Sequence, residues 1–276
     1  NVPVDERIMT IALNMERLRW LPRELGDTYV LVNLADFTLK AVHKDITSLK
    51  MRVIIGKDFQ STPSFSSKMT SLVLNPYWNI PESITRDEIV PIIKNSPGYL
   101  DERGIEILRG WDPGQRVVDP YDIDLRSIAD PREGYRLRQR PGPANPLGAV
   151  KLLMPNRFDI YLHDTPADYL FEREVRTFSH GCIRLEKPLE LAAFAMRKSP
   201  RWNRTKLTAG IATGHRYELN LPEPLDVMVL YQTAWADAKG GVTFRRDIYG
   251  RDRELTRTLW ESAVIPASKG LPEAAP

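Results

Sequence analysis

Short apolar runs broken by polar turns make up much of this chain outside its middle third. Runs rich in Val, Leu and Ile between such turns predict strands, and in the first part of the chain they lie at 28–34, 37–42, 49–55 and 71–74. The pattern returns at 150–154, 158–162, 216–219, 226–231 and 242–245. Many short strands with few helices favour a mainly β protein with some α, built on a sandwich or barrel-like core.

The chain begins with a helical pattern instead. Apolar residues recur there at intervals of three and four, at Ile8, Ile11, Met15 and Leu18. This spacing predicts one apolar stripe on a helix, with Asp5 as its cap and Pro22 beyond its end. We therefore assign 1–22 to an N-terminal helix, and we expect a second, short apolar helix at 188–196.

The pattern changes between residues 82 and 145, where proline and glycine recur closely and disfavour long regular elements. Thr85 and Glu88 have the spacing of a capping box, which predicts a short helix. A small core could form from Trp111, Tyr121, Ile123, Leu125, Ile128 and Leu137. Long ordered insertions often serve as lids or binding loops, so we expect an inserted subdomain at 82–145; the alternative is a disordered surface loop.

The remaining segments then divide into a core and a tail. We assign 23–81 and 146–235 to one catalytic domain, and 236–276 to a C-terminal strand and tail.

Charge and hydropathy exclude two classes of partner. The net charge is only +3, and basic residues are mixed with acidic ones. Arg136, Arg138 and Arg140 alternate, which favours a solvated strand face, and no zinc-finger spacing, RNP-like strand or long basic run supports nucleic acid. No apolar run approaches the ~20 residues that span a bilayer. We expect neither a nucleic-acid partner nor a membrane span in this chain.

The residues that carry chemistry gather in one short stretch. Residues 179–184 read Ser-His-Gly-Cys-Ile-Arg and hold the single cysteine, Cys182, while His163 lies 19 positions upstream of it. A thiol is nucleophilic as thiolate, and a nearby histidine can take its proton. A turn at Gly181 could aim the amides of Gly181 and Cys182, with that of His180, at one oxyanion. These residues predict a cysteine acyl transferase or hydrolase.

Two histidines compete for the role of base. We choose His163 because it comes from a separate strand, whereas His180 is tied to the turn and would orient it or line the pocket. The third member of the catalytic set is assigned to Asp164, through either its backbone carbonyl or its carboxylate.

Candidate substrate contacts surround this set. Tyr161 alternates with His163 on one strand, and Arg184 alternates with Cys182 and could pair with a carboxylate. Ser179, Thr165 and Trp78 complete the candidates, with a place in the core as the alternative for Trp78.

Other interpretations of the cysteine are less well supported. A lone cysteine is often a small buried apolar residue. A zinc site from His163, His180, Cys182 and His215 lacks the paired ligands that structural sites usually show. Penicillin-binding-protein chemistry is disfavoured because neither Ser-x-x-Lys nor Lys-Thr-Gly occurs. We expect no metal and no cofactor.

The motif resembles the signature of the L,D-transpeptidases of the YkuD type. That signature is a histidine, a spacer, Ser/Thr-His-Gly-Cys, an apolar residue, and Asn or Arg. Here 15 residues separate His163 from Ser179, and Arg184 takes the last position. The stretches 75–81, 138–143 and 145–148 resemble the large periplasmic members of the family. The resemblance therefore runs from about residue 29 to about residue 232.

This resemblance implies both a fold and a reaction. The fold is a YkuD-type β-sandwich or barrel-like catalytic core with an inserted capping subdomain. In the reaction, Cys182 attacks a peptidoglycan tetrapeptide stem, D-alanine leaves, and an amine of a second stem forms a 3→3 cross-link. His163 is the implied base, with the backbone carbonyl of Asp164 as its partner. Carbapenems are the implied covalent inhibitors.

The resemblance also leaves alternatives. One is a carboxypeptidase or endopeptidase of the same family, and another is a non-catalytic peptidoglycan-binding module. The implied location is the periplasm or cell envelope. Residues 1–5 do not resemble a signal peptide, so we expect the chain to start as a mature or a trimmed protein does, and an upstream anchor or domain is left open.

Overall fold

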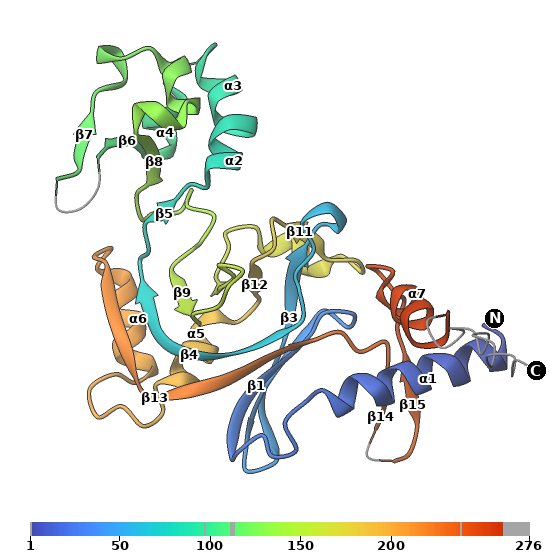
Figure 1. Ribbon diagram of the computed structural model, residues 1–276. Helices are drawn as coiled ribbons and strands as arrows, with labels where there is room; N and C mark the ends of the chain where they lie inside the picture. The colour runs from blue at the N-terminus through green and yellow to red at the C-terminus, as the bar shows by residue number, and fades with distance from the viewer. Residues whose placement is uncertain (1, 97, 111–113, 238, 262–276) are drawn as a thin grey trace, which may run out of the picture.

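The computed structural model describes residues 2–96, 98–110, 114–237 and 239–261, and its centre is a nine-stranded sheet (Figure 1). The strands of this sheet are β1 (Thr28–Asn33), β2 (Thr38–His43), β3 (Ile46–Gly56), β4 (Phe65–Leu74), β9 (Val150–Leu153), β10 (Leu162–His163), β11 (Thr177–Ser179), β12 (Ile183–Leu185) and β13 (Tyr217–Leu230).

The sheet closes on itself through β3. The strand order is β11-β3-β12-β10-β9-β4-β13-β1-β2, and β3 also pairs with β2. The long β3 can do this because its first part pairs with β2, Val53 and Ile54 pair with β12, and its end pairs with β11. Strand content is 32% and helix content 31%. The prediction of a β core that is barrel-like, with some α and an N-terminal helix, is confirmed.

The last long strand of the barrel was predicted as two. β13 runs through both predicted strands, with a register shift between Asn220 and Leu225. Pro222 and Pro224 lie inside this shift, and proline cannot donate to the strand ladder. The prolines therefore mark a bulge and not a turn between strands.

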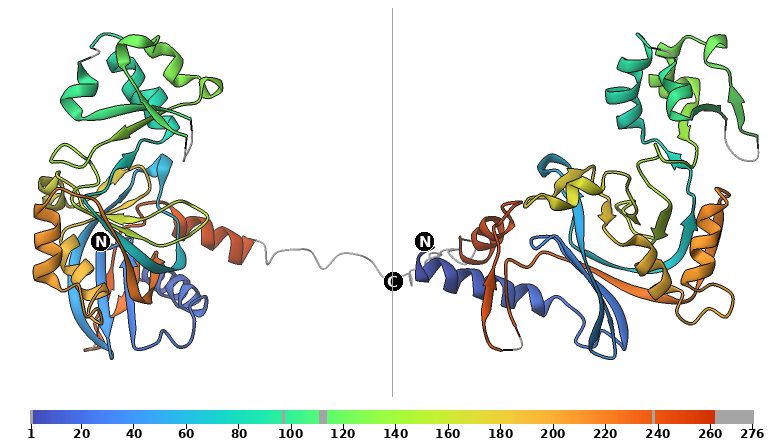
Figure 2. Two further views of the ribbon diagram at one scale, coloured as in Figure 1. Left: turned by 90° about the vertical axis from the view of Figure 1, so that its left-hand side faces the viewer. Right: turned by 180° about the vertical axis from the view of Figure 1, so that it is seen from behind.

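Two helices cover one end of the barrel (Figure 2). The predicted helix at 188–196 is α5 (Pro188–Ala195), and it contributes Leu191 and Ala192 to the main core. The second, α6 (Arg204–Ala212), was not predicted because its apolar residues are few. Asn203 caps it by accepting a hydrogen bond from the amide of Lys206 at 3.0 Å.

The segment between β4 and β9 folds as a separate lobe (Figure 1). Its sheet has the order β5-β8-β6-β7, formed by β5 (Trp78–Asn79), β6 (Ile105–Arg109), β7 (Arg116–Val118) and β8 (Tyr135–Gln139). Its short helices are α2 (Glu82–Ile84), a π-helix η2 (Thr85–Ile89), α3 (Val90–Ile93), α4 (Tyr99–Arg103), and the 3₁₀ turns η3 (Pro120–Asp122), η4 (Leu125–Ala129) and η5 (Pro131–Glu133). Buried residues of the lobe form a core distinct from that of the barrel.

Several details of the lobe differ from the sequence-based expectation. Ile128 and Leu137 are buried as predicted, but Tyr121 is 79% exposed, and Trp111 lies outside the described residues. The capping-box interpretation of Thr85 is wrong, because helical structure already begins at Glu82. The lobe core instead takes most of its residues from the helices and β6, at Ile84, Ile89, Val90, Ile93, Leu100, Ile105 and Ile107.

The arginine row on β8 is paired within the lobe and not simply solvated. Arg138 donates from Nε and Nη2 to Glu106 Oε2 at 3.1 and 2.7 Å, and its guanidinium lies 4.3 Å from the centre of the Tyr77 ring. Arg136 donates to the carbonyl of Gly110 at 2.7 Å.

The N-terminal helix exists, but its predicted buried face is wrong. In α1 (Val4–Arg19), Ile8, Met15 and Leu18 are exposed, whereas Leu13 and Asn14 are buried. Pro3 precedes the helix without a side-chain cap, so Asp5 does not cap it. No helix in the described ranges has the length and apolar character that crossing a membrane requires.

Polar contacts explain which face of α1 is buried. Asn14 Nδ2 donates to Thr233 Oγ1 at 2.8 Å, and Asn14 Oδ1 accepts from the Thr233 amide at 2.9 Å. Arg17 forms an ion pair with Asp252 in α7 (Arg251–Thr256). A hairpin of β14 (Ala234–Ala236) and β15 (Val242–Phe244) also lies beside α1, and the π-helix η7 (Arg257–Glu261) follows α7. The helix is thus anchored by buried polar groups that an apolar pattern cannot reveal.

Candidate active site

Two adjacent parallel strands position the predicted residues. In the pairing of β10 with β12, Leu162 lies opposite Ile183 and His163 lies opposite Arg184. Leu162 and Ile183 are fully buried in the barrel core. Because side chains alternate along a strand, His163 and Arg184 lie on the other face of the sheet.

The pairing continues one residue back, to the positions before each strand. The Ile183 amide donates to the Tyr161 carbonyl at 3.2 Å, which places Tyr161 beside Cys182. The rings of Tyr161 and His163 lie 5.6 Å apart between centroids. The structure therefore brings Cys182, His163, Tyr161 and Arg184 together on one face, as the alternation in the sequence predicted.

A residue that sequence reasoning missed joins this group from the next strand. Lys151 on β9 lies opposite His163, and its Nζ is 3.8 Å from the centre of the Tyr161 ring. Lys151, His163 and Arg184 thus form one row across three strands. The available signal was a single lysine within the otherwise apolar strand at 150–154.

His163 is held as a neutral imidazole with one free nitrogen. It is 4% exposed, and its Nδ1 lies 2.5 Å from the Asp164 carbonyl oxygen. A carbonyl only accepts, so the ring proton is on Nδ1 and the lone pair is on Nε2. Burial lowers the pKa of His163 to about 3, and the positive charges of Arg184 and Lys151 act in the same direction. His163 is therefore available to accept a proton at neutral pH.

The thiol is also neutral at rest. Burial raises the pKa of Cys182, and contacts from Tyr161 with the charges of Lys151 and Arg184 only partly offset this. Burial likewise raises the pKa of the Tyr161 hydroxyl. Burial therefore favours the neutral forms of both Cys182 and His163.

The two alternatives for Asp164 are separated by its contacts. Its carbonyl faces His163, while its carboxylate accepts from the amides of Ala149 and Thr165, both at 2.7 Å. Gly148 makes room for this carboxylate, since its φ is +59° and a Cβ there would lie 2.4 Å from Asp164 Cγ. The carboxylate therefore stabilises the backbone at Ala149 and Thr165, and the carbonyl orients the imidazole of His163. Thr165 is buried beside it and accepts from the Ala167 amide at 3.2 Å.

Ser179 and Gly181 shape the turn that presents the thiol. Gly181 has a φ of +114°, which side-chain-bearing residues rarely adopt. Its amide donates to Ser179 Oγ at 3.1 Å, and the same hydroxyl donates to the Cys182 carbonyl. Ser179 is buried, and these contacts occupy its hydroxyl within the turn. The Gly181 amide is therefore engaged by a hydroxyl, whereas within the described parts of the chain the amides of His180 and Cys182 have no backbone acceptor.

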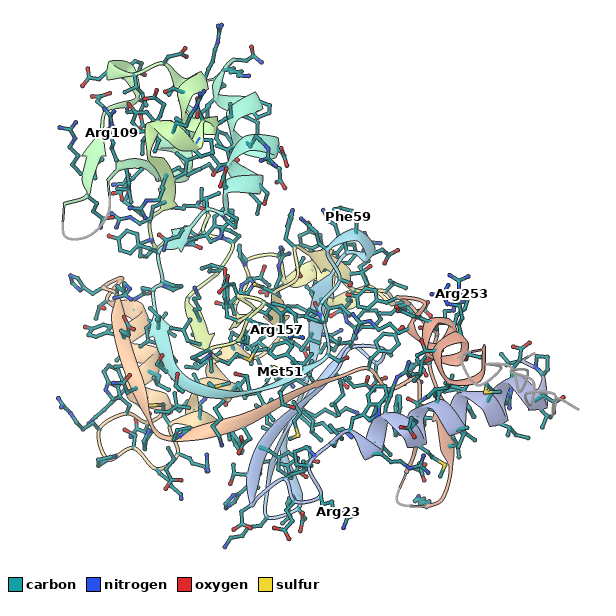
Figure 3. All side chains as sticks on the ribbon, in the orientation of Figure 1. Arg23, Met51, Phe59, Arg109, Arg157 and Arg253 are labelled. Atoms are coloured by element: carbon teal, nitrogen blue, oxygen red, sulfur yellow. The ribbon has the colours of Figure 1, made fainter. Side chains whose placement is uncertain are left out.

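Thr62 holds the turn from outside. Its Oγ1 donates to the Gly181 carbonyl at 2.8 Å and accepts from the Gly56 amide at 2.9 Å. Thr62 follows the 3₁₀ turn η1 (Asp58–Gln60), from which Phe59 projects outward (Figure 3). The Lys57 amide also donates to the Ser179 carbonyl at 2.9 Å, so this loop contacts the turn at both of its ends.

The C-terminal segment completes the support. Arg251 Nη2 donates to the Thr62 carbonyl at 2.7 Å, and the Tyr249 hydroxyl donates to the Gly56 carbonyl. The guanidinium of Arg251 lies 4.9 and 4.8 Å from the ring centres of Tyr231 and Tyr249. Residues far along the chain thus fix the carbonyl and hydroxyl of Thr62.

The remaining two candidates point elsewhere. His180 Nε2 lies 2.9 Å from Glu88 Oε1 on η2 of the lobe, so its ring faces the insertion. Trp78 lies on β5 and packs against the lobe core. Among the described residues, no hydrogen bond or ring contact joins Trp78 to the Cys182 group. Nor do three or more His, Cys, Asp or Glu side chains cluster as metal ligands anywhere in the described ranges.

The sequence matches a known family over the segment that holds this site. The model of the YkuD family, described as the L,D-transpeptidase catalytic domain, matches residues 27–205. The chain belongs to this family. A Haemophilus influenzae protein named as a candidate L,D-transpeptidase is 35% identical over 245 residues, which are 89% of this chain and 48% of that protein. The chain therefore spans about half the length of this relative.

Solved structures of L,D-transpeptidases show weaker similarity. An enzyme from Mycobacterium smegmatis is 12% identical, with a TM-score of 0.32, over 74% of this chain and 58% of that one. L,D-transpeptidase 3 from Mycobacterium tuberculosis is 11% identical, with a TM-score of 0.33, over 74% and 61%. Family membership therefore rests on the sequence match.

Proposed function

We propose that this YkuD chain is a cysteine-dependent peptidoglycan L,D-transpeptidase that forms 3→3 cross-links through an acyl-enzyme on Cys182. The observation that carries the proposal is the neutral His163, oriented by the Asp164 carbonyl on the strand beside Cys182. An imidazole with its Nε2 lone pair available, on the strand beside the one that follows a cysteine, can accept the proton of the attacking thiol.

The residues support a two-step reaction. In the first step, Cys182 sulfur attacks the carbonyl of the L-to-D amide of a tetrapeptide stem as its proton passes to Nε2 of His163. The amides of Cys182 and His180 stabilise the oxyanion. The C–N bond then breaks, and the D-alanine amine leaves with the proton from His163. In the second step, an amine of another stem attacks the thioester, gives its proton to His163 and releases the Cys182 thiol.

Other residues have supporting roles in this proposal. Tyr161, beside the sulfur, contacts the donor stem, while Ser179 and Thr165 act on the shape of the site since their side chains are engaged there. Trp78 packs against the core of the lobe, and its contact with substrate stays a prediction. The predicted insertion at 82–145, which forms most of the lobe, acts as a cap, and the His180–Glu88 contact connects it to the catalytic turn.

A hydrolase of the same family would use water in place of the second amine, and a wall-binding module would leave Cys182 unreactive. The natural substrate class places the enzyme in the periplasm or cell envelope. Carbapenems would acylate Cys182 as covalent inhibitors, and no cofactor is needed.

Mass spectrometry of products from purified tetrapeptide muropeptides tests the proposal. We expect cross-linked dimers and released D-alanine, a carbapenem adduct on Cys182, and neither in the Cys182→Ala variant, which should keep its fold. Tripeptides without dimers would indicate the hydrolase. An adduct on the alanine variant, or loss of wild-type activity to a chelator, would exclude the thiol mechanism.

A further inference from the structure

We propose that Lys151 and Arg184 form a carboxylate-binding pair beside Cys182, which holds an anionic group of the acyl donor in front of His163. This rests on the proposed function, because the ligand is the donor of that reaction. To the carboxylate contact that the sequence suggested for Arg184, it adds a second residue, Lys151, and the geometry of the pair.

The first observation is a half-buried arginine, Arg184, whose enclosed Nε has no hydrogen-bond partner among the described residues. The Nε of Arg184 is inaccessible to solvent and makes no hydrogen bond, and within the described ranges no carboxylate pairs with this guanidinium. A guanidinium has five donors, and leaving a buried charged group unsatisfied is costly. Other well-covered arginines in the structure do have acceptors, as Arg17 with Asp252, Arg138 with Glu106 and Arg251 with the Thr62 carbonyl.

The second observation is the lysine on the opposite side of His163. Lys151 places its ammonium over the Tyr161 ring, and within the described residues it too has no carboxylate partner. Burial lowers the pKa of both Lys151 and Arg184, so each is a partly desolvated cation. Asp164, which follows His163 in the chain, already has its carboxylate on the amides of Ala149 and Thr165.

The strand register fixes how the two cations are placed. Lys151 lies opposite His163, and His163 lies opposite Arg184, on neighbouring strands. Adjacent strands are about 4.8 Å apart, so the two Cα atoms flank His163 at a separation of roughly 10 Å. Both side chains are long enough to converge on one anion between them. The nucleophile, one position before Ile183, borders the same space.

A site for a carboxylate between Lys151 and Arg184 would fit a group that the acyl donor carries. The leaving amino acid of an acyl donor with a free C-terminus carries a carboxylate next to the scissile amide. A carboxylate on the acyl-side residue is a second source of the same group. Either one would supply the missing acceptors of Arg184, and charge-assisted hydrogen bonds are the stronger ones in proteins.

A comparison of donor peptides tests the pair. Acylation of Cys182 is followed by intact mass for three synthetic stems: one with both carboxylates free, one with the C-terminal carboxylate as an amide, and one with the side-chain carboxylate as an amide. We expect one amidation to lower kcat/KM by about 10- to 100-fold in the wild type, as for loss of a hydrogen bond to a charged group. The amide that causes the loss identifies which carboxylate is bound.

Variants then assign the loss to these residues. Arg184→Gln and Lys151→Gln should slow the free-acid stem but leave the sensitive amide stem nearly unchanged, so the preference disappears. Arg184→Lys should restore part of it. Arg204→Gln, an exposed arginine paired with Glu190, is the matched control and should keep the wild-type preference.

The proposal is overturned if neither amidation slows the wild-type enzyme, a result that needs no variant to fold. It is also overturned if Arg184→Gln and Lys151→Gln both keep the wild-type preference. Absence of acylation of Cys182 by every stem and by a carbapenem would instead contradict the proposed function itself.

Discussion

Replacing Thr62 by valine should separate the shape of the catalytic turn from the reactivity of the thiol. Thr62 is 0% exposed, and its hydroxyl serves both the Gly181 carbonyl and the Gly56 amide. Valine has nearly the same shape, so the substitution opens no cavity but leaves two buried polar groups unpaired. Each such group costs about 1–3 kcal/mol, giving about 2–6 kcal/mol if nothing relaxes. At roughly 2–4 °C per kcal/mol, a clear fall in Tm follows.

The kinetic effect should be specific to carbonyl chemistry. Once the Gly181 carbonyl is released, the adjacent Cys182 amide no longer points reliably at the oxyanion, and loss of one such donor costs about 10²–10³ in rate. Acylation by a carbapenem forms an oxyanion, whereas alkylation by iodoacetamide does not. We therefore expect Thr62→Val to slow acylation at least about tenfold more than alkylation. Thr62→Ser keeps the hydroxyl and should recover most of the acylation rate.

Three results would contradict this reasoning. Wild-type acylation in the valine variant would show that Thr62 does not hold the turn. Equal slowing of acylation and alkylation would indicate a general loss of structure around the thiol. A serine variant as slow as valine would show that the hydroxyl alone does not hold the turn.

Further predictions concern the base, the lobe and acid stability. His163→Ala should lower the rate of carbapenem acylation by about 10²–10⁴, and higher pH should restore part of that rate. His180→Ala should show no rescue by pH, because the His180 ring faces Glu88. The reverse pattern in stopped-flow measurements of acylation would exchange the roles of the two histidines. Replacing 82–145 by a short Gly-Ser linker should weaken the reaction with muropeptide more than with a small β-lactam, and equal effects would make the lobe scaffold only. The folded pKa of His163 is about 3 against 6.5 unfolded, so the unfolded chain binds more protons between these values and stability should fall as pH drops through this window. In Tm measurements His163→Gln should fall less steeply over the same pH range, and parallel curves would show that His163 is not buried as a neutral group.

The sequence could predict those features of the fold and site that depend on residues close together in the chain. Tyr161 and His163 are two apart on one strand, as are Cys182 and Arg184, so alternation alone places each pair on one face. Strands such as β1, β2 and β9 were found because each is a local apolar run, whereas β11 and β12, which flank the catalytic turn, were not predicted. The pairing of β10 with β12 then brings these two pairs of residues together.

Contacts between distant segments could not be predicted in this way. Lys151 enters the site only because β9 pairs with β10, and Thr62 and Arg251 reach the turn through polar contacts across the fold. The wrong face predicted for α1 has a similar cause. An apolar stripe is a poor guide where a buried amide, Asn14, makes the decisive contacts.

The place of β13 in the barrel has a consequence for how far this chain can be truncated. The segment that matches the family, 27–205, contains both Cys182 and His163 but ends before β13. Yet β13 lies between β4 and β1 and pairs with both. A fragment trimmed to the matched segment would therefore open the barrel between two long strand edges, and exposed edges invite aggregation. The residues proposed as catalytic are contained in one part of the chain, but the smallest unit that can fold around them is longer.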